Sequence, residues 1–160
     1  MFHSMEELEK KMTECGYLID HQVATVVYLA IRLQKPLLVE GPAGVGKTEL
    51  GKVLARTTNS RLIRLQCYEG LDEAKSLYEW NYQKQLLYLH VKQNQSKAWH
   101  EAKDDIFTPE FLLRRPLLEA LESTKPVVLL IDEVDKSDEE FESFLLEILR
   151  SEERRVGKEC

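Results

Sequence analysis

The chain has 160 residues, of which 43% are apolar and 31% are charged, and these proportions exclude a disordered or collagen-like protein. Its 22 Lys and Arg against 28 Asp and Glu give a formal charge of −6, which argues against a nucleic-acid partner. No apolar run approaches the length of a membrane span, and the first residues do not resemble a signal peptide. We therefore expect a cytoplasmic protein with no membrane partner.

Capping residues and apolar spacing predict the elements of the first part of the chain. Ser4 and Glu7 have the spacing of a capping box, and Asp20 is a cap for the helical spacing that follows it. Pro36 ends that second pattern. The sequence thus predicts a short helix after Ser4, a helix over about 21–34, a buried strand over 37–39, a helix over about 47–58 and a strand over 62–65.

The second part of the chain continues the alternation of helices and strands. The apolar run Val127–Ile131 predicts a third buried strand. The other predicted elements are helical segments within 72–93, a long polar loop over 93–105, helices beginning near Pro109 and Pro116, and a helix capped by Ser137 and Glu140. This alternation predicts an α/β fold with a mostly parallel sheet and flanking helices.

Residues 41–48 fit the pattern G-x-x-x-x-G-K-[ST] between a predicted strand and a predicted helix, which is typical of a phosphate-binding loop. The loop amides and the helix N-terminus can face an anion. The Lys47 ammonium can reach the β- and γ-phosphates, and the Thr48 hydroxyl can bind Mg²⁺. The alternative is a glycine-rich turn with an exposed lysine. The candidate nucleotide-binding residues are Gly41, Pro42, Ala43, Gly44, Val45, Gly46, Lys47 and Thr48, and Lys47 is also a candidate catalytic residue.

Two carboxylates, Asp132 and Glu133, directly follow the predicted strand Val127–Ile131, which is the Walker B pattern. Ligands of open α/β sheets bind at the carboxyl ends of the strands. Asp132 is therefore a candidate ligand for the nucleotide and for Mg²⁺, and Glu133 is the candidate catalytic base that polarises the attacking water. A strand that ends at a solvated turn is the alternative. Glu133 directly follows Asp132, and the predicted strand over 62–65 lies between the loop and this pair in the sequence. Together these features favour the additional-strand branch of P-loop ATPases.

These motifs resemble those of an AAA+ ATPase, and more closely those of its MoxR family. The resemblance runs from about Tyr17 to Leu149. Two strings, Tyr68-Glu69-Gly70 and Glu79-Trp80-Asn81-Tyr82, are similar to the branch associated with carbon monoxide dehydrogenase maturation. The segments that carry the resemblance are 16–20, 38–41, 46–49, 64–72, 78–82, 115–121 and 131–136.

The resemblance implies a Mg²⁺-dependent ATPase that forms a homo-oligomeric, hexameric ring and acts as a chaperone in complex assembly or metal-cofactor insertion. A von Willebrand factor A domain protein is the implied partner. The resemblance also adds Glu49 to the nucleotide-binding segment. It places Tyr17 and Ile19 near adenine, with core packing as the alternative, and Gln66 near Glu133, with an ordinary loop-facing amide as the alternative.

We expect residues 1–149 to form part of an AAA+ nucleotide-binding domain, with the first three strands of its sheet. The resemblance further implies a sensor strand, an arginine finger and a helical lid, which these residues do not contain. An arginine finger contributes about 10³ to 10⁵ in rate in related enzymes, so this chain alone is expected to be nearly inactive. Residues 150–160 resemble a translated sequencing adapter, and we expect them to be a non-native tail.

Two other functions stay open from the sequence. One is a nucleic-acid-acting AAA+ ATPase, such as a loader or helicase subunit, which the acidic balance opposes. The other is a nucleotide-binding module without hydrolysis, which Glu133 opposes. Contact with a neighbouring subunit's nucleotide is the alternative to a surface role for Arg114 and Arg115, and no chemistry is assigned to Cys160 in the expected tail. The residues expected to serve packing or surface roles are Cys15, Cys67, His3, His21, His90, His100, Arg114 and Arg115.

Overall fold

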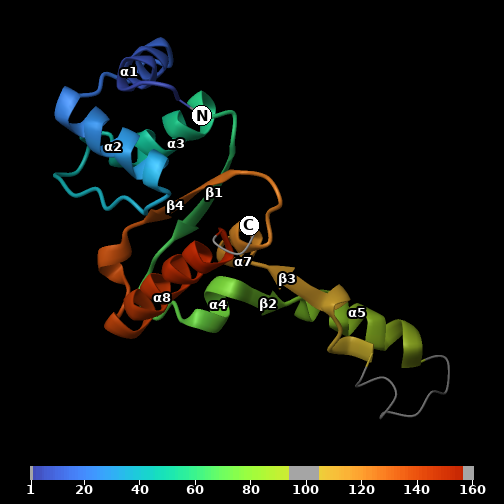
Figure 1. Ribbon diagram of the computed structural model, residues 1–160. Helices are drawn as coiled ribbons and strands as arrows, with labels where there is room; N and C mark the ends of the chain where they lie inside the picture. Colours follow the sequence, from blue (N-terminus) through green and yellow to red (C-terminus); the bar gives the residue numbers. More distant parts are fainter. Residues whose placement is uncertain (1, 94–104, 157–160) are drawn as a thin grey trace. The chain divides into compact units, whose positions relative to one another are not determined.

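The computed structural model describes residues 2–93 and 105–156 (Figure 1). Within them the chain has an α/β fold and divides into two compact units. The first unit combines Met1–Leu71 with Ser123–Cys160, and the second is Asp72–Glu122. Most of the predicted loop over 93–105 and the end of the predicted tail lie outside the described residues. In the described part, no helix is both long and apolar enough to cross a membrane.

The first unit contains a pair of parallel strands. β1 (Arg61–Gln66) and β4 (Val127–Asp132) are hydrogen-bonded neighbours, and Gln66 lies opposite Asp132 at their carboxyl ends. Both strands confirm the sequence prediction. The helical elements of this unit are α1 (Met5–Glu14), α2 (His21–Leu33), α3 (Lys47–Thr57), η2 (Val134–Lys136) and α8 (Glu139–Val156).

The predicted caps are confirmed at the first two helices. The Ser4 hydroxyl oxygen accepts a hydrogen bond from the Glu7 amide at 3.2 Å. The Asp20 carboxylate accepts one from the Gln22 amide at 2.8 Å. Each cap gives a partner to a backbone donor that has none within its helix.

The cap predicted for the last helix, α8, is wrong by one residue. The Asp138 carboxylate, not the Ser137 hydroxyl, accepts the hydrogen bond from the Phe141 amide, at 2.8 Å. The Ser137 hydroxyl instead donates to the Val134 carbonyl in the preceding turn. A carboxylate is favoured at this position because its charge also interacts with the helix dipole.

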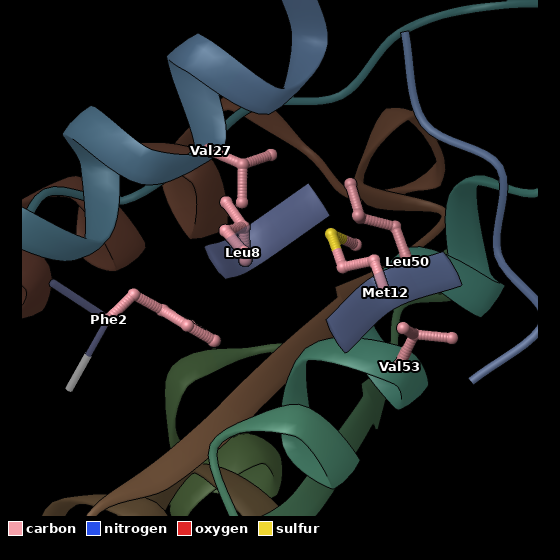
Figure 2. Packing of buried hydrophobic residues seen from close by; sticks show 6 residues of the cluster. All are labelled: Phe2, Leu8, Met12, Val27, Leu50 and Val53. Atoms are coloured by element: carbon pink, nitrogen blue, oxygen red, sulfur yellow. The ribbon is translucent and has the colours of Figure 1, made fainter. Parts of the chain in front are cut away.

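Three helices of the first unit share one buried apolar cluster, shown in Figure 2. Leu50 and Val53 are three residues apart on α3, so both side chains lie on the face toward the cluster. Burying a side chain of this size contributes about 1.5–3 kcal/mol. The cluster therefore anchors α3, the helix that begins at the glycine-rich loop. Its members are Phe2, Leu8, Met12, Val27, Leu50 and Val53.

A glycine allows α3 to lie close to β4. A Cβ atom at Gly51 would lie 3.1 Å from Cδ1 of Leu130, which is tighter than an ordinary contact. Leu130 is two residues before Asp132, and Gly51 is three residues after Thr48. The close approach at Gly51 therefore sets how near the start of α3 comes to the end of β4.

We expect Gly51→Val to lower the free energy of unfolding by about 1–3 kcal/mol, because the added methyl groups overpack the contact with Leu130. Urea denaturation followed by circular dichroism measures this change. Lys52→Val is the matched control, since it places the same β-branched residue at the next, partly exposed position of α3. Valine has a higher helix propensity than glycine, so no loss of stability in Gly51→Val would show that the contact with Leu130 accommodates the added methyl groups.

The strand predicted over 37–39 is not formed. Residues 35–42 have no regular secondary structure, and the Leu38 side chain is 71% exposed. A strand needs a neighbour for its backbone hydrogen bonds, and the described residues offer β4 only β1 as a partner. Hydrophobicity alone was therefore not sufficient for strand formation here.

The second unit contains a short antiparallel strand pair that the sequence did not predict. β2 (Tyr78–Trp80) pairs with β3 (Leu112–Arg114), and strands of this length are too short to show a two-residue period. The helix start predicted at Pro116 is confirmed, and a three-residue 3₁₀ turn begins at Pro109. The helical elements of this unit are α4 (Glu73–Leu77), α5 (Tyr82–Gln93), η1 (Pro109–Phe111) and α7 (Pro116–Leu121).

Candidate nucleotide-binding site

The glycine-rich loop ends directly at the first residue of α3. Gly44 and Gly46 have φ of 81° and 92°, a left-handed conformation that glycine adopts without steric cost. Gly46 is the N-cap of α3 and makes no side-chain cap hydrogen bond. The first amides of α3 therefore remain available to an anion, with the positive end of the helix dipole behind them.

The Lys47 side chain folds back over the loop. Its ammonium donates hydrogen bonds to the carbonyls of Gly41 and Pro42, the latter at 2.7 Å. These bonds hold the two ends of the loop together around one positive charge. A bound phosphate would meet both this ammonium and the loop amides.

The structure brings together the two predicted metal ligands. The Thr48 hydroxyl lies 3.2 Å and 3.3 Å from the two carboxylate oxygens of Asp132, although the residues are 84 positions apart in sequence. The first turn of α3 and the carboxyl end of β4 meet here. Hydroxyl and carboxylate oxygens are hard ligands of the kind that Mg²⁺ prefers.

The oxygen atoms of Thr48 and Asp132 fit Mg²⁺ when phosphate and water oxygens supply the rest of its coordination shell. Among the described residues, no group of three or more His, Cys, Asp and Glu side chains could hold a metal without such help. Mg²⁺ keeps several waters and binds through one or two protein ligands together with substrate phosphates. Thr48 and Asp132 are therefore matched to a metal that arrives with a nucleotide.

Glu133 lies next to Asp132 in an unusual backbone conformation. Its φ is 56°, in the left-handed region that non-glycine residues seldom adopt. Its carboxylate accepts hydrogen bonds from the Gln66 side-chain amide at 2.7 Å and from the Lys136 ammonium at 2.6 Å. The expected contact between Gln66 and Glu133 is thus confirmed. The hydrogen bond to Glu133 also raises the pKa of the Lys136 ammonium.

Arg64 is a member of this network that sequence reasoning missed. Its guanidinium contacts a carboxylate oxygen of Asp132 at 2.7 Å and the side-chain oxygen of Gln66 at 2.7 Å. The two-residue period of a strand places residues 64 and 66 on one face, which was the available signal. Lys136 was missed because its contact with Glu133 depends on the turn of η2.

Tyr17, between α1 and α2, packs against the glycine-rich loop. Its hydroxyl lies 3.5 Å from the Gly46 carbonyl oxygen, and its ring would be 3.6 Å from a Cβ atom at that glycine. Burial, and then the charge of Glu49, raises the pKa of the Tyr17 hydroxyl. Tyr17 and Ile19 both pack against the buried cluster, so core packing is the role that the structure gives to Ile19.

The structure also places Glu49 and three residues for which the sequence predicted packing or surface roles. Glu49 forms an ion pair with Lys52 at 2.9 Å, and this hydrogen bond lowers the pKa of the Glu49 carboxyl. Cys67 is buried, and burial followed by the nearby carboxylates raises the pKa of its thiol, which keeps it unreactive. In the second unit, Arg114 and Arg115 form exposed ion pairs with Glu122 and Glu79 at 3.2 Å and 3.4 Å.

A glycine-rich loop that opens a helix, with a strand-end carboxylate beside its threonine, defines the class of P-loop nucleoside triphosphatases. The family model described as AAA domain (dynein-related subfamily) matches residues 36–159, and the chain belongs to this family. No curated protein and no solved structure matches the chain. AAA+ domains bind and hydrolyse nucleotides and commonly form oligomeric rings. The match extends into the predicted tail, whose origin stays a prediction.

Proposed function

We propose that this chain binds ATP together with Mg²⁺ and carries the catalytic residues for its hydrolysis. The observation that carries the proposal is the contact between Thr48 and Asp132, with Glu133 as the next residue. This contact brings the phosphate loop and the acidic strand end to one place. Membership of a family whose domains bind and hydrolyse nucleotides supports the proposal.

Each proposed role follows from the chemistry of the side chain. The loop amides and the Lys47 ammonium bind the phosphates and neutralise their charge. Thr48 and Asp132 would hold Mg²⁺, which would supply neutralisation of the phosphate charge. Glu133 accepts a proton from the water that attacks the γ-phosphate. Gln66 and Lys136 hold the Glu133 carboxylate in place until then.

We also propose a biological role for the protein. We infer a MoxR-like ring ATPase that acts as a chaperone in complex assembly or metal-cofactor insertion, with a von Willebrand factor A domain partner. Its support is the set of strings named above, within a subfamily that includes MoxR-like ATPases. Copurification of the protein with a von Willebrand factor A protein encoded by a neighbouring gene tests the partner. Salt-dependent binding of DNA would favour a loader or helicase subunit instead.

Nucleotide binding is the direct test of the proposed biochemical function. The purified chain is titrated with a fluorescent ATP analogue in Mg²⁺ and again in EDTA. We expect saturable binding that unlabelled ATP displaces and that weakens in EDTA. Absence of binding in both buffers would contradict the proposal. Phosphate release is measured over hours with the chain in excess of ATP, so that a single slow turnover is detected.

A further inference from the structure

One guanidinium group connects the two acidic residues of the candidate site. Nη2 of Arg64 donates to the Asp132 carboxylate and to the Gln66 side-chain oxygen, both at 2.7 Å. The Gln66 side-chain nitrogen in turn donates to the Glu133 carboxylate at 2.7 Å. The three acceptors belong to β1, the end of β4 and the residue after β4. Arg64 thus lies at one end of a chain of hydrogen bonds that leads to Glu133.

The direction of the Gln66 amide follows from this arrangement. A glutamine side chain has one accepting end and one donating end, while arginine only donates and an ionised carboxylate only accepts. With Arg64 on one side, the Gln66 oxygen must face the guanidinium, and its nitrogen then faces Glu133. The reversed amide would place its oxygen against a carboxylate and its nitrogen against a cation. Both contacts would be repulsive.

The strand geometry explains why Arg64 can make both bonds. Residues 64 and 66 lie on the same face of β1 because strand side chains alternate. The parallel register sets Gln66 opposite Asp132, so a long side chain from position 64 reaches toward the carboxyl end of β4. The Asp132 side chain is 18% exposed and that of Arg64 is 51% exposed. The ion pair is therefore shielded on the aspartate side and open to solvent on the arginine side.

We propose that Arg64 is a positioning residue of this site, which orients the Gln66 amide so that Gln66 holds Glu133 beside Asp132. The inference rests on the proposed function, because Glu133 and Asp132 take their roles from it. In this role Arg64 acts neither on the nucleotide nor on the attacking water directly. It acts through Gln66 and fixes the spacing between the carboxylate that holds the metal and the carboxylate that accepts the proton.

The first test does not need turnover. The side-chain amide protons of Gln66 are assigned by NMR in the free chain, with Gln66→Ala as the reference for assignment. We expect Arg64→Met and Glu133→Ala each to shift these signals toward those of a solvated glutamine amide. Arg61→Met is the control, because it removes an arginine at the opposite end of the same strand. Unchanged Gln66 signals in Arg64→Met would overturn the inference.

The second test separates catalysis from binding. We expect Arg64→Met to slow single-turnover phosphate release by roughly tenfold, as for a partly exposed charged hydrogen bond, with the ATP affinity within about twofold. Arg64→Lys keeps the charge and is expected to restore part of the rate. The double variant Arg64→Met/Gln66→Ala should be no slower than the slower single variant, since both act on the same contact. Additive losses would overturn the relay through Gln66.

Failure of the inference and failure of the proposed function give different results. A wild-type chain that does not bind ATP contradicts the proposed function, while the NMR test of Gln66 still decides the role of Arg64. Normal ATP binding, together with Gln66 amide signals that do not change in Arg64→Met, contradicts the inference alone. Thermal unfolding of each variant is recorded first, and Arg64→Leu replaces Arg64→Met in the NMR test where the latter does not fold.

Discussion

Lys47→Ala is expected to weaken ATP binding by roughly 10- to 100-fold. The lysine ammonium contributes charge-assisted hydrogen bonds to the phosphates, and a bond of this kind is worth about 1.5–3 kcal/mol. The substitution also removes the two bonds that the ammonium makes to the Gly41 and Pro42 carbonyls. Isothermal titration with ATP and Mg²⁺ measures the change in the dissociation constant.

The control for this prediction is a second lysine on the same helix. Lys52 is five residues further along α3 and forms an ion pair with Glu49. We expect Lys52→Ala to change the ATP affinity by less than about twofold, since surface ion pairs contribute about 0–1 kcal/mol to stability and this one does not face the loop. Equal losses of affinity in the two variants would mean that net positive charge, not the position of Lys47, attracts the nucleotide.

The sequence was sufficient to predict how the candidate site comes together. The loop pattern at 41–48 and the acidic end of the strand at Val127–Ile131 are local signals. Ligands of open α/β sheets bind at the carboxyl ends of the strands, so both signals were assigned to one site, although the strand predicted before the loop is not formed. The contact between Thr48 and Asp132 agrees with that expectation.

The parts that the sequence did not predict depend on tertiary pairing. The apolar run 37–39 has the composition of a strand, yet strand formation requires a neighbouring backbone, and none pairs with it among the described residues. Arg64 and Lys136 are charged residues in exposed positions, which sequence patterns assign to solvent by default. Their contacts follow from the parallel register of β1 and β4 and from the left-handed backbone at Glu133.

The unusual backbone at Glu133 also bears on mechanism. A non-glycine residue at φ 56° costs about 1–3 kcal/mol and persists where surrounding contacts hold it. Here the contacts are the hydrogen bonds from Gln66 and Lys136. They hold the Glu133 carboxylate at the end of β4, next to the carboxylate that meets the phosphate loop. The strain at Glu133 is therefore matched to its proposed role as the catalytic base.

Glu133→Gln is expected to slow ATP hydrolysis by roughly 10² to 10⁴ while ATP binding stays within about threefold of wild type. Glutamine has nearly the same shape and can still accept a hydrogen bond from Gln66, but it cannot take a proton from water. The exposed ion pair with Lys136 is lost, which costs no more than about 1 kcal/mol. Single-turnover phosphate release, with the chain in excess of ATP, measures the rate.

Asp135→Asn supplies the matched control for the loss of a charge near the site. Asp135 is an acidic residue two positions after Glu133, in η2, and it makes none of the contacts that join Arg64, Gln66, Asp132, Glu133 and Lys136. We expect Asp135→Asn to retain both binding and hydrolysis, and Glu133→Gln to accumulate bound ATP that chromatography of the extracted nucleotide detects. Hydrolysis at the wild-type rate in Glu133→Gln would show that another group takes the proton, and the assignment of the base would move to a different residue.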